Sequence, residues 1–281
     1  EILRHEVREF LSDALKDIPK ETRAETWYGA DENFSRKVGQ KGWIGLNWPK
    51  EYGGAGRSSM ERYVILEEML TAGAPVGAHW ISDRQSGPLI IRYGSEKHQK
   101  ELLPGILKGE SYFCIGMSEP DSGSDLAALR TKAEKKGNIY LVNGTKLWTS
   151  GAHRCQYMIA LFKTSQEEDR HGGFSQFIVD LSLPGVTIRP IIDLAGRHHF
   201  NEVIFEDVEV PEDMLIGTEG NGWNQVTAEL ALERSGPERY LSSYILLQEL
   251  VNEFSNKNDD EGVIEIGRQM SHLTTLRQMS V

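Results

Sequence analysis

The amino-acid sequence predicts an α+β multidomain protein with an N-terminal helical domain, a middle antiparallel β-barrel-like domain and the start of a C-terminal helical bundle. Two observations support this prediction. Helix start and stop signals occur in the first stretch, and a helical pattern returns in the last one. The stretch between them holds short β-branched and aromatic runs separated by turn residues. We therefore expect three domains, at residues 1–110, 111–217 and 218–281.

The first stretch carries signals for at least two helices. Ser58 and Glu61 have the spacing of a capping box, which predicts a helix over the run Met60–Leu70 that follows. A second helix is expected over Ser95–Leu103. We expect it to end at Pro104, because proline has no backbone N–H to donate within a helix.

The middle stretch has the pattern of short strands joined by turns. Gly137-Asn138 lies where a hairpin turn would follow the run Lys132–Lys136, and Pro211 closes the β region. Strands without helices between them exclude a strand–GxGxxG–helix unit, so any nucleotide bound here is held in another way. The strand-like runs are Tyr112–Met117, Ile139–Val142, Tyr157–Phe162, Phe177–Asp180 and Val203–Val210.

The third stretch is helical from Gly222, and the pattern reaches Val281 without a stop signal, so we expect a fragment that lacks most of a C-terminal helical domain. Glu233 falls inside an apolar stripe if this helix is continuous. A carboxylate on an apolar face must be paired, for which Arg234 is available, or its pKa rises and it can act as a base. Both interpretations stay open here. The stripe consists of Val226, Leu230, Leu241 and Tyr244.

Composition excludes several classes of partner. The net charge of −11 argues against nucleic acid or an anionic membrane as the main partner, and no apolar run is long enough for membrane insertion. Cys114 and Cys155 lie in β-like runs without ligand-spaced neighbours. We therefore expect neither a disulfide framework nor a metal site, and we expect a cytoplasmic location. No secretory signal is recognisable, and whether a targeting segment was removed is left open.

Two motifs contain the candidate binding residues. In IGMSEPDSGSD, residues 115–125, a strand leads into a Ser/Gly-rich loop whose hydroxyls and backbone N–H groups suit a phosphate. In LWTSG, residues 147–151, Trp148 stands beside two hydroxyls, an arrangement that can pack against a planar ring and hydrogen-bond its heteroatoms. Taken alone, the motifs favour the ordinary interpretations, a connecting loop for the first and a core tryptophan with turn residues for the second.

Five segments together resemble the acyl-CoA dehydrogenases, in family order and at family spacing over nearly the whole chain. SEPDSGSD resembles the flavin-contacting TEPxAGSD-type segment, and KLWTSGAH resembles the K-x-W-I-T segment. LALERSGPER resembles the start of the first long C-terminal helix. FEDVEVPEDMLIG resembles the strand and turn that close the middle domain, and GWIGLNWPKEYGG resembles an N-terminal segment. The family fold has the same helix–β–helix order.

The resemblance implies FAD as cofactor, bound without a covalent link, because His153 and the pair His198-His199 fall in predicted turns. Ser118 would hydrogen-bond the pyrimidine edge of the flavin, and the Ser150 hydroxyl would point towards N5. Both serines stand where many family members carry Thr, and the hydroxyl is kept. The residues implied in cofactor binding are Ile115, Met117, Ser118, Gly123, Ser124, Trp148, Thr149 and Ser150.

The implied reaction is α,β-dehydrogenation of an acyl-CoA thioester in fatty acid metabolism. A carboxylate removes the α-proton while a hydride leaves the β-carbon for flavin N5, which gives the trans-2-enoyl-CoA. Glu233, directly before Arg234, occupies the base position of a minority of the family, and a carboxylate beyond Val281 is the alternative. Ser124 and Arg234 would contact the substrate.

The resemblance also implies partners. An electron-transfer flavoprotein would accept the electrons, and the functional form would be a homo-oligomer, a tetramer. Two alternatives stay open: an acyl-CoA oxidase of the same fold, and a non-catalytic partner subunit of a heteromeric acyl-CoA dehydrogenase. The sequence does not determine the length or branching of the acyl group.

Overall fold

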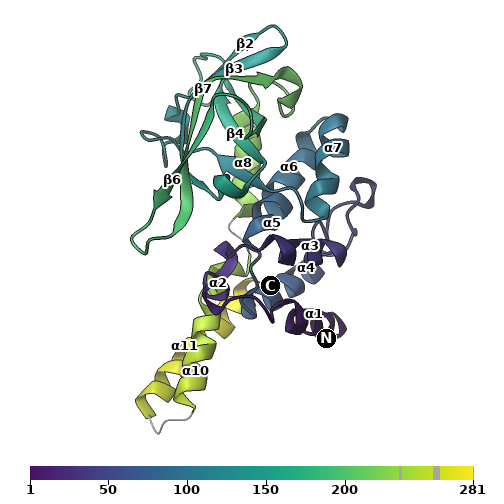
Figure 1. Ribbon diagram of the computed structural model, residues 1–281, viewed down its shortest axis with the longest axis vertical. Coiled ribbons are helices and arrows are strands. Elements are labelled where there is room, and N and C mark those ends of the chain that lie inside the picture. The colour runs from purple at the N-terminus through teal and green to yellow at the C-terminus, as the bar shows by residue number, and fades with distance from the viewer. Residues whose placement is uncertain (234–235, 256–259, 281) are drawn as a thin grey trace. The chain divides into compact units, whose positions relative to one another are not determined.

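The computed structural model describes residues 1–233, 236–255 and 260–280 (Figure 1). The chain folds as two compact units. The helical unit comprises Glu1–Trp80 and Glu233–Val281, and the sheet unit comprises Ile81–Leu232. The domain limits expected from the sequence stay a prediction.

The helical unit contains short helices from both ends of the chain. Ser58 caps α4 as predicted: its Oγ accepts the Glu61 backbone N–H at 3.2 Å, and the Glu61 carboxylate accepts the Ser58 N–H at 2.9 Å. The helices are α1 (Ile2–Ala14), α2 (Lys20–Ala24), α3 (Glu32–Gln40), α4 (Ser59–Thr71), α5 (Gly77–Ile81, which leads into the sheet unit), α9 (Glu238–Leu241), α10 (Tyr244–Phe254) and α11 (Asp260–Ser280).

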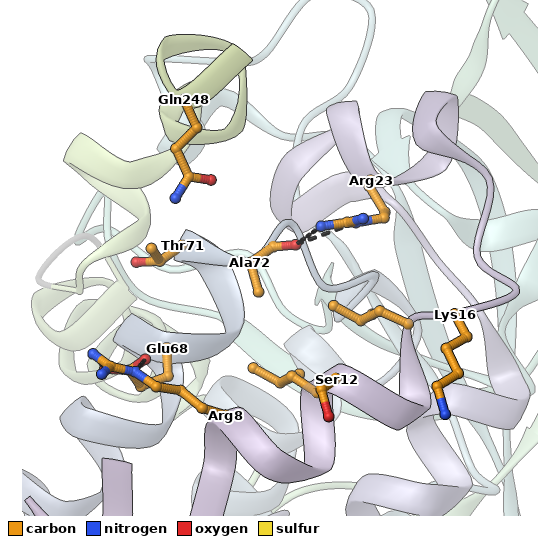
Figure 2. A pocket seen from close by; sticks show the side chains of 10 residues that line it. Arg8, Ser12, Lys16, Arg23, Glu68, Thr71, Ala72 and Gln248 are labelled. Atoms are coloured by element: carbon orange, nitrogen blue, oxygen red, sulfur yellow. Dashed lines mark hydrogen bonds and ion pairs between the residues drawn. The ribbon is translucent and has the colours of Figure 1, made fainter. Parts of the chain in front are cut away.

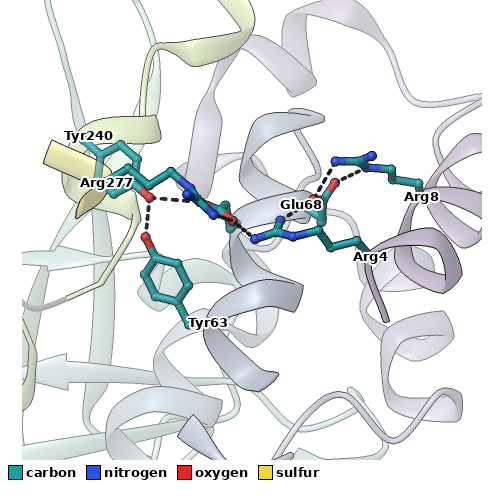
Figure 3. A network of polar contacts seen from close by, with 7 residues as sticks. Arg4, Arg8, Tyr63, Glu68, Tyr240 and Arg277 are labelled. Carbon is teal, nitrogen blue, oxygen red and sulfur yellow. Dashed lines mark hydrogen bonds and ion pairs between the residues drawn. The ribbon is translucent and has the colours of Figure 1, made fainter. Parts of the chain in front are cut away.

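A buried ionic network joins four helices of this unit (Figure 3). Glu67 and Glu68 are buried on α4, and Arg4 on α1 donates to both carboxylates at 2.5 Å. Arg277 on α11 donates to Glu67 through Nε and through Nη2, the latter at 3.2 Å. Tyr240 on α9 also donates to Glu67, at 3.4 Å. Glu67 is therefore the centre of this network.

Replacing Glu67 with Ala is expected to lower the free energy of unfolding by about 1.5–3 kcal/mol, because it removes charged hydrogen bonds from Arg4 and Arg277. Burial raises the Glu67 pKa, but the hydrogen bonds and charges of Arg277 and Arg4 outweigh it and hold that pKa below 4.5. The Glu67 contribution is thus present above pH 4.5 and is lost as the pH falls further. Denaturant unfolding at several pH values measures it, and Asp13→Ala, at an exposed ion pair, should stay near wild type.

A shallow hollow of about 420 Å³ lies on the helical unit, lined by residues of α1, α2, α4 and α10 (Figure 2). Its cations are already engaged. Arg8 donates to Glu68, Arg23 donates to the Ala72 carbonyl at 2.7 Å, and Lys16 pairs with Asp13 at 2.8 Å. None of the sequence-predicted binding residues lines this hollow.

The sheet unit is built around a seven-stranded curled sheet with strand order β1-β4-β2-β3-β7-β6 and β5 paired to β4. Its core is aromatic, with Tyr140, Phe162, Phe177 and Phe205 buried together. The strands are β1 (Phe113–Gly116), β2 (Lys132–Lys136), β3 (Ile139–Ser150), β4 (Tyr157–Lys163), β5 (Phe174–Asp180), β6 (Val186–Ile192) and β7 (His198–Pro211). Besides the end of α5, the longer helical segments among the described residues are a π-helical turn (Ser82–Ser86), α6 (Gly87–Tyr93), α7 (Glu96–Leu107) and α8 (Gly222–Glu233).

The predicted fold class is confirmed, with three differences in detail. The sheet is mixed, because β1 pairs with β4 in parallel while the other ladders are mainly antiparallel. β6 was not expected, since Pro190 interrupts its pattern and it lies at the edge of the sheet. α7 continues past Pro104 to Leu107, where the prediction ended it. The proline sits near the helix end, so one backbone bond is lost, and the Lys108 N–H closes the last turn on the Pro104 carbonyl at 3.2 Å.

The single long helix assumed for the apolar stripe is also wrong. α8 ends at Glu233 and α9 starts only at Glu238. Pro237 explains the break, because its ring would clash with the carbonyl four residues earlier in a continuous helix. Val226, Leu241 and Tyr244 therefore belong to three different helices, and the stripe no longer supports a role for Glu233. No helix in the described part of the chain is long and apolar enough to cross a membrane.

Candidate functional site

The two sequence motifs lie side by side in the sheet unit, at the point where β1 has ended and β3 approaches its own end. The Leu147 N–H donates to the Ser118 carbonyl at 2.8 Å. The Lys146 Nζ donates to the Met117 carbonyl at 3.1 Å. Residues about thirty positions apart are thereby held next to each other, so Met117 and Ser118 adjoin the segment that carries Trp148.

A buried ion pair fastens the two segments. Lys146 is 0% exposed, and its Nζ lies 2.9 Å from Glu119 Oε1. Glu119 also accepts the backbone N–H groups of Arg130 and Thr131, at 2.6 and 3.0 Å. Burial lowers the pKa of Lys146 to about 8, although Glu119 opposes this. For the Glu119 carboxylate, burial acts in the opposite direction and raises the pKa. The charge of Lys146 and the hydrogen bonds from the two N–H groups outweigh burial, so the pKa of Glu119 lies below its usual value.

Trp148 stands on a distorted part of β3. Its φ is 60°, which few residues other than glycine adopt, and the β3–β7 register shifts between Lys146 and Thr149. The indole is 56% exposed and meets Phe200 edge to face, with ring centroids 5.9 Å apart. A large apolar ring is thus presented outward by strained backbone. Strain of this kind is typical of ligand and catalytic sites.

Three hydroxyl residues near Trp148, in the next two positions of β3 and in the adjoining segment, have no hydrogen-bond partner for their hydroxyls within the described residues. Ser118 and Ser150 are half-buried, and neither hydroxyl makes a hydrogen bond within the described residues. Thr149 is 1% exposed, and its Oγ1 also has no partner there. A buried hydroxyl without a hydrogen bond is unfavourable. A bound planar heterocycle that packs on the indole and accepts from the half-buried Ser118 and Ser150 hydroxyls fits this arrangement, as expected for a flavin ring, whereas Thr149 Oγ1 is enclosed by the protein.

The Ser/Gly loop is held by its own backbone. Glu119 and Ser122 exchange N–H···O bonds of 2.7 and 3.1 Å, and the Ser122 hydroxyl donates to the Asp125 carbonyl at 2.7 Å. Gly123 and Ser124 are exposed beyond this turn, and nothing lies within 4 Å of a Cβ built on Gly123. The loop is therefore rigid at its base and open at its tip, which suits close approach of a phosphate to the backbone.

The predicted residues do not all appear together. Met117, Ser118, Trp148, Thr149 and Ser150 form one cluster, Gly123 and Ser124 follow on the adjoining loop, and Ile115 lies half-buried in β1. The backbone of Glu233 ends α8, but its side chain lies outside the described part of the structure, as does the whole of Arg234. Their predicted roles therefore stay predictions.

The sequence interpretation missed Asn201 and misplaced two histidines. His198 and His199 begin β7 and are not turn residues. The His153 and His198 rings stack with centroids 3.8 Å apart, and both hydrogen-bond to Asn201, which is 0% exposed. The roles of Glu119 and Lys146 were also missed. Both are charged residues inside motifs that the sequence predicts to be β-strands and turns, and a charged residue in such a position indicates a buried ion pair.

Comparisons with known proteins agree with this arrangement. The sequence matches the family description "Acyl-CoA dehydrogenase, N-terminal domain" over residues 1–110 and "Acyl-CoA dehydrogenase, middle domain" over residues 114–208. Acyl-CoA dehydrogenase FadE29 of Mycobacterium tuberculosis is 38% identical over 246 residues, which is 86% of this chain and 63% of that protein. This chain thus spans less than two thirds of the length of that relative.

Solved structures give the same result. The fold matches the Tcur3481-Tcur3483 steroid ACAD with a TM-score of 0.87 at 29% identity, covering 99% of this chain and 73% of that one. It matches the ChsE4-ChsE5 complex from Mycobacterium tuberculosis with a TM-score of 0.84 at 31% identity, covering 99% and 74%. From the matched domains, the relatives and the shared fold, we conclude that this chain belongs to the acyl-CoA dehydrogenase family.

Proposed function

We propose that the protein carries out FAD-dependent α,β-dehydrogenation of an acyl-CoA thioester to the trans-2-enoyl-CoA. The observation that supports this most directly is the outward-facing Trp148 on strained backbone, near Ser118 and Ser150, whose hydroxyls make no hydrogen bond within the described part of the chain. Family membership supplies the chemistry, because FAD, when bound, accepts the hydride from the substrate β-carbon.

The chain's own residues would bind and orient the cofactor. Trp148 would cover one side of the flavin ring, Ser118 would hydrogen-bond its pyrimidine edge, and Ser150 would donate towards N5. Ile115, Met117 and Thr149 would complete the wall of the site, with Gly123 and Ser124 near the pyrophosphate or the substrate. The hydroxyls lack other partners in the described residues, so these bonds would compete with no internal hydrogen bond.

The base is proposed to be Glu233, with Arg234 beside the substrate. This proposal rests on the family resemblance, in which a Glu directly before an Arg at this place is the base of a minority of members. A carboxylate in that position would take the α-proton of the thioester as a general base.

The test is an absorption spectrum of the full-length protein followed by anaerobic addition of acyl-CoAs. Flavin bands that bleach with at least one thioester are expected, and acid precipitation should release the FAD into the supernatant, since it is held without a covalent link. Slow reoxidation by air with fast reoxidation by an electron-transfer flavoprotein supports a dehydrogenase, whereas fast reoxidation by air supports an oxidase. A folded protein without flavin contradicts the proposal and supports the partner-subunit alternative.

The relatives suggest which substrates to include and which assembly to expect. One similar structure is titled a steroid ACAD, so thioesters of steroid-derived acids belong in the panel beside straight and branched acyl-CoAs. Two of the matched structures are named for pairs of chains, which favours a second candidate form: a heteromer in which this chain is one of two kinds of subunit.

The assembly prediction is that full-length protein expressed alone sediments as a tetramer with full flavin content. A tetramer fits the homo-oligomer implied by the family resemblance. If the protein sediments as a smaller species that gains flavin only when a second subunit is co-expressed, the heteromer replaces the homo-oligomer.

Replacing Ser150 with Ala is expected to weaken FAD binding or to slow flavin reduction without unfolding the protein. One hydrogen bond to a neutral acceptor contributes about 0.5–1.5 kcal/mol, roughly a two- to tenfold change. FAD titration, stopped-flow reduction and the melting temperature measure the three effects. A change in melting temperature alone, with flavin binding and reduction intact, would make Ser150 an ordinary turn residue.

A further inference from the structure

Asn201 links the distorted end of β3 to two histidines. It lies in β7 opposite Thr149 and is 0% exposed. Its Nδ2 donates to the Thr149 carbonyl at 3.0 Å. Its Oδ1 lies 2.7 Å from His198 Nε2 and 3.2 Å from His153 Nδ1. Within the described residues, every hydrogen bond of this buried amide therefore leads either to Thr149 or to the histidine pair.

The hydrogen bonds determine which way the amide points. Arg154 Nε can only donate, and it lies 3.0 Å from His153 Nε2, so this nitrogen accepts and the proton of the neutral ring is on Nδ1. Nδ1–H then donates to Asn201 Oδ1, as does His198 Nε2–H. A reversed amide would place its oxygen against the Thr149 carbonyl, where neither atom can donate. The histidines thus hold the Asn201 Nδ2 group towards Thr149.

Through its hydrogen bond to the Thr149 carbonyl, Asn201 in β7 can hold the distorted part of β3 in place. The regular ladder is interrupted between Lys146 and Thr149, and Trp148 takes a φ of 60° in the gap. Such backbone is unfavourable and persists only where its surroundings constrain it. Asn201 lies opposite Thr149 in the β3–β7 ladder, so its side chain acts at the edge of this distortion.

We propose that Asn201, oriented by His153 and His198, is a positioning residue that sets the direction in which Trp148 and Ser150 face the flavin. The inference deepens the proposed function and rests on it, because the flavin is the group that those two side chains would hold. Asn201 itself touches neither cofactor nor substrate in this assignment. It acts through the backbone carbonyl of Thr149.

The test compares Asn201→Asp with Asn143→Ala in the full-length protein. Aspartate keeps the acceptor for both histidines but cannot donate to Thr149. Asn143 offers a matched control, because it bridges the other distortion of the same β3–β7 ladder through two 2.9 Å bonds with Asp207, whose φ is 51°. Two quantities are measured: hydrogen exchange of residues 148–151, and FAD affinity together with the visible spectrum of the flavin.

Asn201→Asp is expected to speed exchange at residues 148–151 and to weaken FAD binding about tenfold, with a shift of the flavin band, whereas Asn143→Ala changes neither. The proposal is overturned if Asn201→Asp lowers the melting temperature no more than Asn143→Ala does and leaves exchange at 148–151 and FAD affinity within twofold of wild type. Hydrogen exchange needs no flavin. A wild-type protein without FAD would therefore contradict the proposed function, while the exchange result would still decide whether Asn201 positions the segment.

A second pair of variants covers the case in which Asn201→Asp does not fold. His198 is half-buried at the start of β7, outside the core. His198→Leu removes one of the two donors that orient the amide, and His198→Gln restores a donor of similar reach. Faster exchange at residues 148–151 and weaker FAD binding in the Leu variant, restored by Gln, support the proposal. Equal values for Leu, Gln and wild type overturn it.

Discussion

Replacing Glu233 with Gln is expected to lower the rate at which an acyl-CoA reduces the flavin by roughly 10²–10⁴-fold, the usual contribution of a general base. Gln keeps the size and hydrogen-bonding reach of Glu but cannot take the α-proton. FAD content and acyl-CoA binding should therefore stay near wild type. Stopped-flow bleaching of the full-length protein with saturating acyl-CoA measures the effect.

Glu229→Gln is the matched control, because Glu229 lies one turn earlier on the same helix and accepts from Gln176 at 3.3 Å. It should retain fast bleaching. If Glu233 is instead half of a buried ion pair with Arg234, its Gln variant should lose about 3–5 kcal/mol of stability and still bleach. A stable Glu233→Gln protein with normal bleaching would rule out both roles and place the base on another carboxylate.

Replacing Glu119 with Gln is expected to lower the free energy of unfolding by about 3–5 kcal/mol, because it leaves the ammonium of Lys146 buried without an opposite charge. The pKa of Lys146, already lowered to about 8 by burial, should fall further in this variant. FAD affinity should fall as well, because the ion pair joins the Ser118 segment to the Trp148 segment.

The loss should depend on pH in a defined direction. The folded-state pKa of Lys146 lies below its ordinary value of 10.5, so between the two values the unfolded chain binds more protons than the folded one. The penalty for burying the ammonium is therefore full below the folded pKa and disappears as the pH rises towards 10.5. Urea unfolding from pH 6 to pH 9 should show the variant recovering relative to wild type as Lys146 becomes neutral.

Two comparisons make this result interpretable. Glu119→Gln combined with Lys146→Met removes both charges and should recover most of the lost stability. Lys135→Ala, at an exposed ion pair with Glu212, should stay close to wild type because solvent screens that pair. If the Gln variant is as stable as wild type and the double variant gains nothing, the ion pair does not hold the two segments together.

The sequence by itself determined the order of the elements and the motifs that carry binding residues. The capping box at Ser58, the hairpin at Gly137 and the strands β4 and β5 each depend on residues within a few positions of one another. Side-chain size, β-branching and missing backbone N–H donors influence the backbone only over a few neighbouring residues. Local sequence patterns therefore predict these elements. The family resemblance of SEPDSGSD and KLWTSGAH is likewise a property of contiguous residues.

Tertiary structure alone decided how those motifs meet. The Leu147 bond to Ser118, the Lys146–Glu119 pair and the Asn201 bond to Thr149 join residues 27 to 52 positions apart. Whether a polar residue there is solvated or buried against a partner depends on the chain packing that closes the sheet, which no local pattern contains. The φ of Trp148 is set in the same way: an isolated tryptophan would avoid it, and only the surrounding ladder and its partners hold the indole outward.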